Sequence, residues 1–423
     1  MKTKNTLAIA LALALAMILV PAASIIADDN SAGDSELYNS GVVLGAAPVN
    51  HIEWEDDAGT QTTTIRFYAD GDAVTVASAT SNPNDSVLLI TFSDGTTQTL
   101  DPADYGAQPN KFVNIFGGSK NASVASSSVT VNSGYINAVY AGGFGDAEAT
   151  PANVTTSSLV MNGGHVTNAV YGGGLLYATV QNATVTMTDG YAMFVMGGGA
   201  CYITPTQNVG TADNPYPSVT GKTTVNINGG NADYVMGGSQ GYGLVNNSEI
   251  NFNDGTAIEV IGSGSNGTTD NSVVNIKGGE VTDYVFSVNR GAVADSATIN
   301  ITGGKVANAY AGASQDSSNT TGKITGSTSL NISGGDVSSI YVGTGLNDAD
   351  VNFNVGDRII IAEGGFSDGA DVDYTVAPGK EWNIESGKLV VPSYGSITLA
   401  SSDEGRGTLN ISDNASFRLL GDL

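Results

Sequence analysis

A glycine-centred motif that recurs along most of the chain constrains the fold more than any other feature. In eight copies of this motif, the residues five and three positions before the last glycine are apolar, which is the period-two alternation of a half-buried strand. That glycine is found at Gly134, Gly164, Gly190, Gly230, Gly255, Gly279, Gly304 and Gly335. Successive copies are 24 to 40 residues apart, and a repeat of this length predicts a stacked array.

The residue between the two apolar positions is asparagine in the later copies. These asparagines are Asn226, Asn251, Asn275, Asn300 and Asn331. The same triplet continues at 351–353, 382–384 and 409–411, so the sequence predicts eleven rungs between Gly134 and Asn414, and a half-rung at 113–118. Stacked asparagines bond amide to amide along a rod. We therefore predict a structural ladder, with a flat polar face that contacts a glycan or another surface as the alternative.

The length of the repeat predicts the fold class. A rung of this length holds about three short strands and three turns, and each rung buries little by itself. Stacking at about 4.8 Å per rung buries the apolar columns and pairs the backbone in parallel ladders. The predicted fold is all-β: a parallel β-solenoid of about eleven rungs, roughly 50 Å long, with a small N-terminal β capping domain.

The chain divides into five predicted segments. Residues 1–27 form a secretory signal peptide, because Lys2 and Lys4 precede an apolar run from Thr6 to Val20 and then small residues. Residues 28–40 are a linker, 41–110 the capping domain, 111–350 the regular repeats and 351–423 degenerate rungs. The apolar run is short for a membrane span of roughly 20 residues. We therefore expect a secreted or cell-surface protein without membrane insertion after signal cleavage.

Charge and reactive side chains argue against several functions. The chain has 15 basic and 41 acidic residues, and its formal net charge of −26 disfavours nucleic acid and anionic lipid as partners. The single cysteine, Cys201, and the two histidines, His51 and His165, provide no disulfide, metal-site or catalytic-triad spacing. We predict no metal, no cofactor and no catalytic residue, and we interpret His165 as a solvated strand residue.

An aromatic column supplies the predicted binding residues. Tyr140, Tyr171, Tyr310 and Tyr341 follow the reference glycine by six or seven residues, where other rungs have methionine, isoleucine or phenylalanine. An exposed stripe of this kind suits stacking on sugar rings or on a partner protein. The alternative is that loops cover the column, or that it turns inward as a core stack.

Two segments carry a family resemblance. They are Gly163-Gly164-His165-Val166 followed by Val170-Tyr171-Gly172-Gly173-Gly174, and Gly229-Gly230 followed by Tyr234-Val235-Met236-Gly237-Gly238. These segments resemble the repeats of secreted prokaryotic adhesin-like proteins, over about residues 112–350. The resemblance implies a right-handed parallel β-helix of the pectin-lyase type.

Three functions fit these features. The first is an adhesin-like binding rod without enzymatic activity, with a glycan or a cell-surface protein as its partner. The second is a polysaccharide lyase or hydrolase, because the pectin-lyase scaffold also hosts such enzymes; Asp283 and Arg290 are its candidate pair, whereas Asp28-Asp29 and Asp56-Asp57 lie outside the rungs. The third is a structural spacer or surface-layer component. Ice binding is not favoured, since no Thr-x-Thr column recurs on every rung.

Overall fold

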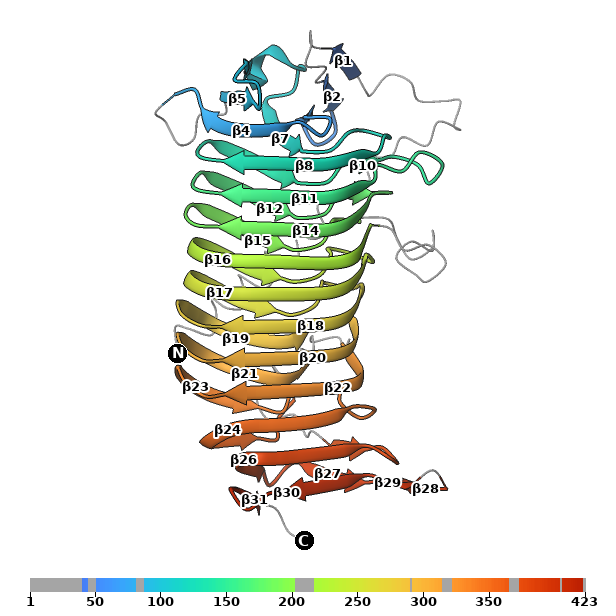
Figure 1. Cartoon of the computed structure of the whole chain (residues 1–423), viewed down its shortest axis with the longest axis vertical. Helices are drawn as coiled ribbons and strands as arrows, with labels where there is room; N and C mark the ends of the chain where they lie inside the picture. The colour runs from blue at the N-terminus through green and yellow to red at the C-terminus, as the bar shows by residue number, and fades with distance from the viewer. Residues whose placement is uncertain are drawn as a thin grey trace.

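The protein is a long rod in which strands wind repeatedly around a common axis (Figure 1). The structure is a computed structural model, and it describes residues 40–44, 51–80, 87–201, 217–289, 291–313, 322–364, 373–403 and 405–420. The predicted signal peptide, and the linker up to residue 39, lie outside the described residues. The described residues form a parallel β-solenoid, as the repeat predicted, with about ten turns where about eleven rungs were predicted.

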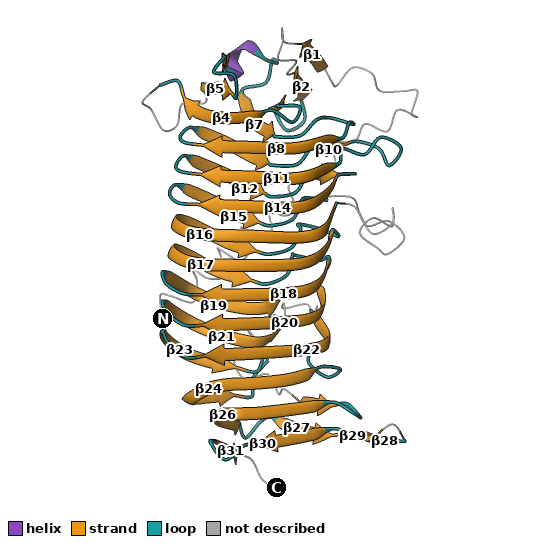
Figure 2. Cartoon of the chain, in the orientation of Figure 1, coloured by secondary structure: helices purple, strands orange, loops and turns teal. Residues whose placement is uncertain are grey.

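The first sheet contains the strand that precedes the glycine in each repeat. Each strand pairs in parallel with its counterparts in the turns before and after it. In chain order the strands are β8 (Val124–Val131), β11 (Val154–Met161), β14 (Thr179–Met187), β16 (Ser218–Met236), β17 (Leu244–Ile261), β18 (Thr268–Ile276), β20 (Val293–Ile301), β22 (Lys323–Ile332), β24 (Asp350–Ile361), β26 (Glu381–Val391) and β30 (Thr408–Ile411). Figure 2 shows these strands stacked along the front of the rod.

The second sheet contains the strand that follows the glycine, and it is also parallel. Strands β16, β17, β24 and β26 bend at the corner and contribute to both sheets. The remaining second-sheet strands are β7 (Asn110–Phe116), β9 (Tyr135–Tyr140), β12 (His165–Tyr171), β15 (Tyr191–Met196), β19 (Glu280–Val288), β21 (Lys305–Ala313), β23 (Asp336–Tyr341) and β31 (Ala415–Leu419). The predicted half-rung at 113–118 is confirmed, because β7 pairs with β9.

Short pairings complete the turns. Parallel strands β10 (Phe144–Gly145) and β13 (Leu175–Leu176) begin a third side, which single bridges extend from Leu175 to Ala200 and from Ala200 to Gln240. Near the C-terminal end, β25 (Asp373–Val376) pairs with β27 (Ser396–Leu399). Strands β28 (Ser401–Ser402) and β29 (Gly405–Arg406) form a small antiparallel pair.

The glycine at the corner between the two sheets has a left-handed backbone. Gly230, for example, has a φ of +79°, and an added Cβ would lie 2.9 Å from the carbonyl oxygen of Gly190 in the turn before it. Only glycine adopts this conformation without strain while allowing so close an approach. The apolar columns on both sides of the corner then face each other, and together they form one continuous core along the rod.

One predicted alignment is wrong. The sequence motif places Val351 and Phe353 on Leu330 and Ile332, but in the structure Phe353 pairs with Leu330 and Val351 with Thr328. The register has shifted by two residues, which keeps the apolar side chains facing inward because strand side chains alternate with a period of two. The later steps, from β24 to β26 and from β26 to β30, follow the predicted alignment.

The N-terminal end combines parallel and antiparallel strands. Strands β3 (Thr62–Tyr68) and β4 (Ala73–Ser78) pair in parallel with β7 and β8 and so add a turn to the solenoid. Strands β1 (Ser40–Leu44) and β2 (His51–Asp57) continue antiparallel from β3, and β5 (Leu88–Phe92) and β6 (Thr97–Leu100) continue antiparallel from β4. A single 3₁₀ turn, Pro102–Asp104, follows β6. The predicted capping region at 41–110 therefore contains one parallel turn and two antiparallel extensions.

Candidate binding surfaces

The predicted aromatic column exists, and its members align across the turns. Tyr171 pairs with Tyr140 on one side and with Met196 on the other, and Tyr341 pairs with Tyr310. The one-residue offset that separates Tyr171 from Tyr140 in the sequence motif is absorbed by a register shift between Val166 and Ala169 in β12. The rings stack along the axis, with centroids 4.6 Å apart between Tyr140 and Tyr171 and 4.8 Å apart between Tyr310 and Tyr341.

Burial excludes the column as an exposed stripe. Tyr140, Tyr171 and Tyr310 are 3 %, 0 % and 5 % exposed, and only Tyr341 is partly exposed. The surface-stripe interpretation is therefore wrong for the first three tyrosines, and the covered alternative holds. These rings lie on the outer side of the second sheet, in an apolar cluster that is separate from the main core. The same cluster also contains Phe144, Leu175, Leu176, Ala200 and Cys201. The second sheet thus carries a second core against the third side of the solenoid.

The buried environment also changes the tyrosine hydroxyls. Burial raises the pKa of Tyr310 well above its ordinary value, and nearby Tyr284 and Tyr341 add to the rise. The hydroxyl of Tyr171 donates a hydrogen bond to Oε1 of Gln240. A raised pKa keeps the Tyr310 hydroxyl neutral, and burial of all these rings suits a packing role rather than contact with a soluble ligand.

The predicted asparagine ladder is confirmed. Nδ2 of Asn251 donates to Oδ1 of Asn226 at 3.2 Å, and Asn275 donates to Asn251 at 3.2 Å. The ladder continues from Asn300 to Asn275 at 2.9 Å and from Asn331 to Asn300 at 3.0 Å. A second run joins the later asparagines, with 3.0 Å from Asn383 to Asn352 and 2.7 Å from Asn410 to Asn383. The two runs lie in different columns because of the register shift at β24.

The ladder belongs to a polar surface that is wider than the flat polar face suggested by the asparagines alone. We call this surface the first-sheet face: four outward-facing columns of the first sheet, which run from Ser126, Ser128, Thr130 and Asn132 at β8, through the matching residues of β11, β14, β16, β17, β18 and β20, to Ser327, Ser329, Asn331 and Ser333 at β22. Its charged members are Lys222, Glu249 and Lys277, its apolar members are Val160 and Val273, and all the others are serine, threonine or asparagine. The signal was the recurrence of these residue types at two-residue spacing beside the asparagines.

Neighbouring columns of this face carry ladders of their own. Asn271 donates to Asn247 at 3.1 Å, and the hydroxyl of Ser296 donates to Asn271 at 2.7 Å. On the other side of the main ladder, Asn162 donates to Asn132 at 3.0 Å. Hydrogen bonds between turns therefore fix side-chain orientation across the width of the face.

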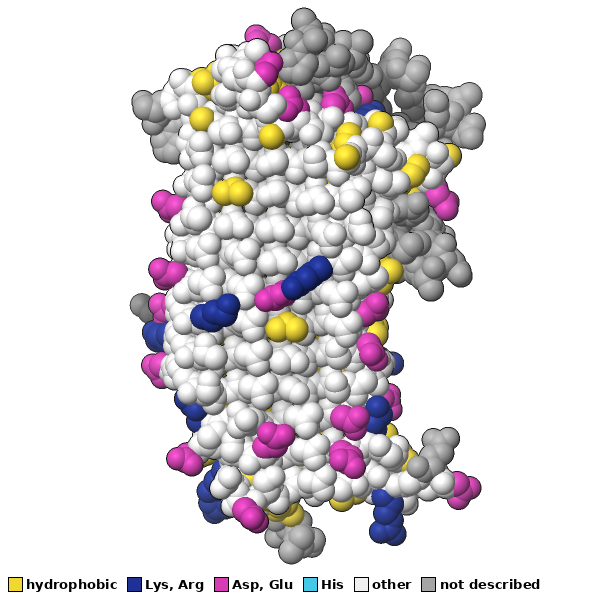
Figure 3. Space-filling model, in the orientation of Figure 1, with side chains coloured by type: hydrophobic (Ala, Val, Ile, Leu, Met, Phe, Trp, Pro, Cys, Tyr) yellow, Lys and Arg dark blue, Asp and Glu magenta, His cyan; other side chains and the backbone are white. Residues whose placement is uncertain are grey.

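The charged residues of the first-sheet face form one group near its centre. The ammonium group of Lys222 bonds to Glu249, and Nζ of Lys277 donates to Oδ1 of Asn251 at 2.9 Å. The hydrogen bond from Lys222 is the main cause that lowers the pKa of Glu249. Figure 3 shows the front of the rod as a broad surface with few charged side chains, most of them near its margins.

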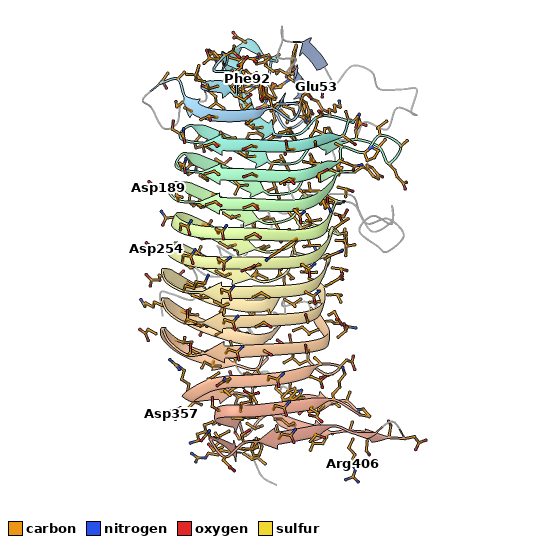
Figure 4. The ribbon with its side chains drawn as sticks, in the orientation of Figure 1. Glu53, Phe92, Asp189, Asp254, Asp357 and Arg406 are labelled. Atoms are coloured by element: carbon orange, nitrogen blue, oxygen red, sulfur yellow. The ribbon has the colours of Figure 1, made fainter. Side chains whose placement is uncertain are left out.

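Acidic side chains border the face. Asp189 and Asp254 lie at the turns between the two sheets, along one edge of the rod (Figure 4), and each caps the amide of the glycine that follows it, at 2.7 and 2.8 Å. Asp270 and Asp295 precede the face residues of β18 and β20, and burial followed by repulsion from Asp295 raises the pKa of Asp270. Both edges of the face therefore carry negative charge.

A ladder of small polar residues lies inside the rod. Thr223, Ser248 and Thr328 face inward from the first sheet, and their hydroxyls donate to the carbonyl oxygens of Gly237, Gly262 and Ala311 at 2.7, 2.8 and 2.7 Å. These bonds tie the first sheet to the corner after the second sheet. All three residues are buried, so their role is structural.

His165 stacks between two tyrosine rings on the second sheet. Its ring centroid lies 5.0 Å from that of Tyr135 and 4.6 Å from that of Tyr191. All three rings are partly exposed, as predicted for His165. Both faces of the His165 ring are therefore covered, and each tyrosine ring has one face against it.

Acidic and tyrosine side chains also meet on the second sheet. The hydroxyl of Tyr191 donates to Oδ2 of Asp233 at 2.9 Å, and Glu259 pairs with Tyr234 and Tyr284 in adjacent turns. Burial raises the pKa of Asp283 to about 6, against the opposing effect of a hydrogen bond with Tyr284. Arg290, the suggested partner of Asp283, lies outside the described residues.

The adjacent carboxylates Asp56 and Asp57 have structural roles, whereas Asp28 and Asp29 lie outside the described residues. Asp56 is buried and accepts hydrogen bonds from the hydroxyl of Thr63 and from the amide of Ala107, the latter at 3.0 Å. Asp57 instead caps the following turn through the amide of Gly59 at 2.8 Å. Within the described ranges, no group of three or more histidine, cysteine, aspartate or glutamate side chains is placed to hold a metal ion.

Comparison with known proteins adds no family to this description. No family model, no curated protein and no solved structure matches the chain. Among the residues that the structure describes, no helix is long and apolar enough to cross a membrane.

Proposed function

We propose that this protein is a secreted or cell-surface rod that binds glycans or proteins without chemical turnover. The observation that supports the proposal is the first-sheet face, which extends over eight stacked strands with one kind of surface chemistry. Many weak contacts along such a face add up through multivalency, because each contact after the first is intramolecular. An adhesin-like role uses length in this way.

The side chains of the face suit binding better than catalysis. A general acid and a nucleophile or base need carboxyl groups held close together across a scissile bond. The first-sheet face has Glu249 as its carboxylate, and that group is paired with Lys222. The remaining hydroxyl and amide groups are hydrogen-bonding groups without acid or base strength near neutral pH.

A polysaccharide hydrolase is the second candidate function. The observation that favours it is Asp283, a partly buried carboxyl with a pKa of about 6, on the same side of the second sheet as Asp233 and Tyr191. A raised pKa is typical of a general acid, although structural carboxylates show it too. This candidate predicts that Asp283→Asn abolishes turnover.

A glycan array combined with turnover assays separates the two candidates. The purified chain is applied to immobilised glycans and, in parallel, incubated with soluble polysaccharides with and without Ca²⁺. Binding without any release of shorter chains supports the binding rod. Cleavage that is lost in Asp283→Asn contradicts it and supports the hydrolase. If the chain neither binds nor cleaves any glycan, glycans are excluded as ligands and a protein partner remains. Binding to a panel of cell-surface protein extracts then tests for that partner.

A further inference from the structure

The first-sheet face differs in charge from the rest of the molecule. The chain has a formal net charge of −26, whereas the face has two lysines and one glutamate, a net of +1. Aspartates lie along both edges of the face, among them Asp189, Asp254, Asp270 and Asp295. An anionic polymer that approached the face would meet this acidic border, and repulsion would lower its local concentration.

The hydrogen-bonding capacity of the face is only partly used inside the protein. An asparagine amide has two N–H donors and a carbonyl oxygen with two lone pairs. In the main ladder Asn300 spends one donor on Asn275 and one lone pair on Asn331, which leaves it a donor and an acceptor for the outside. Asn251 is an exception, because it also donates to Glu249 and accepts from Lys277. The ladder also holds these groups in one orientation, which reduces the entropy lost on binding.

The apolar content of the face is low. Val160 and Val273 are its apolar members, and they lie in different columns and several turns apart. Specific protein–protein interfaces have an apolar, often aromatic centre that supplies most of the binding energy. The face lacks such a centre, so its chemistry suits a partner that is itself rich in hydroxyl groups.

We propose that the first-sheet face binds an extended, uncharged polysaccharide that runs along the rod. This inference rests on the proposed binding function and specifies the surface and the ligand class. A sugar polymer offers donors and acceptors at every residue, which matches a face that offers both at every turn. The group formed by Lys222, Glu249 and Lys277 supplies charge-assisted hydrogen bonds to sugar hydroxyls at the centre of the face, and these are stronger than neutral ones.

The test uses insoluble cellulose, β-1,3-glucan and mannan as uncharged probes, and immobilised polygalacturonate and heparin as anionic ones. The variant is the double substitution Ser158→Glu and Thr298→Glu, which places two long acidic side chains on β11 and β20 of the face. Both positions are partly exposed and point outward. The control is Ser338→Glu, an exposed position of the second-sheet strand β23, which adds the same kind of charge elsewhere.

We expect the wild-type chain to bind at least one uncharged probe and neither anionic one. Because the ligand itself is uncharged, salt has no ligand charge to screen, and binding should change less than about twofold between 50 and 500 mM salt. The double variant should lose at least tenfold in affinity, and Ser338→Glu should bind like wild type. Circular dichroism and thermal unfolding of all three chains establish that the variants are folded.

Three results would overturn the inference, and they are distinguishable from failure of the proposed function. Binding to the anionic probes alone, full binding by the double variant, or adsorption to ice or to a protein in place of polysaccharide would each show that the face or the ligand class is wrong. In these cases a binding rod still stands. Absence of binding to every glycan and every protein tested would remove the proposed function and the inference together.

Discussion

The asparagine ladder makes a quantitative prediction about stability. In Asn275→Ala the chain loses two ladder hydrogen bonds, one of 3.2 Å to Asn251 and one of 2.9 Å from Asn300. Each such bond contributes about 0.5–1.5 kcal/mol net, so the free energy of unfolding should fall by about 1–3 kcal/mol. Water reaches this half-buried column and rehydrates the two abandoned amides, which favours the lower part of that range.

Position along the ladder supplies an internal control. Asn331 ends the described run and donates one ladder bond, of 3.0 Å, to Asn300. Asn331→Ala should therefore cost about half as much as Asn275→Ala, or about 0.5–1.5 kcal/mol. Ser329→Ala, on the same face, removes a hydroxyl that makes no side-chain hydrogen bond in the described part of the chain, and it controls for the general effect of alanine in a strand.

Urea unfolding followed by circular dichroism measures these differences from the shift in midpoint at a common slope. The reasoning requires the order Asn275→Ala, then Asn331→Ala, then Ser329→Ala, from the most to the least destabilising. If Asn275→Ala were no more destabilising than Ser329→Ala, the ladder would contribute nothing, and the argument from ordered amides would fail with it.

Three further substitutions test other parts of the account. Gly230→Ala should lower stability by more than about 2 kcal/mol, because the φ of Gly230 is +79° and the new Cβ would contact Gly190. Gly95→Ala is the control: its φ is +84° but the space around it is open, so it should cost only about 1 kcal/mol. Equal shifts in melting temperature for the two variants would contradict the close-packing argument. Lys120→Met should cost about 1–3 kcal/mol and increase hydrogen exchange in β2, because it leaves the partly buried Glu53 without its ammonium partner at 2.8 Å. Lys305→Met, which breaks an exposed ion pair, should cost clearly less, and similar costs would refute the role of burial. Asp283→Asn should raise the melting temperature at pH 7, and this advantage should disappear as the pH falls through 6 towards 4. Burial raises the pKa of Asp283 in the folded state to about 6, so between pH 6 and 4 the folded wild type binds a proton that the unfolded chain does not, and the wild type gains stability as the pH falls. A difference in melting temperature that does not depend on pH would refute this argument.

Repetition is the reason why so much of the fold could be predicted from the sequence. Each column of the solenoid is sampled many times, so the apolar positions five and three residues before the glycine identified the inward side of the first sheet without ambiguity. The ladder from Asn226 to Asn331 followed from the same alignment, because residues at equal distance from the glycine must stack.

The errors occurred where local pattern and tertiary packing diverge. The triplet Val351-Asn352-Phe353 imitates the repeat, yet pairing in the structure shifts it by two residues, and period-two alternation gives no signal of such a shift. Alternation likewise placed the tyrosine column on the outer side of the second sheet correctly, but it says nothing about what covers that side. The cover, which includes Leu175 and Cys201, comes from the short third side that follows the second sheet.

The extent of the first-sheet face was not predicted for a different reason. Serine, threonine and asparagine are common in surface strands and turns, so no single one of them marks a site. What distinguishes the face is the small number of charged residues over several columns at once, in a chain with 41 acidic residues. That contrast becomes visible only after the turns are stacked in register.

The dependence of affinity on ligand length tests the central claim, which is binding along an extended face, most directly. Oligosaccharides of increasing length are prepared from the uncharged polysaccharide that the protein binds. Each is titrated into the protein, and its affinity is measured by calorimetry. The face from β8 to β22 spans seven intervals of about 4.8 Å, or roughly 34 Å. The account predicts that affinity keeps rising until the oligosaccharide reaches about that length and then levels off. Affinity that is already maximal for a di- or trisaccharide would place the ligand in a compact site and contradict the account.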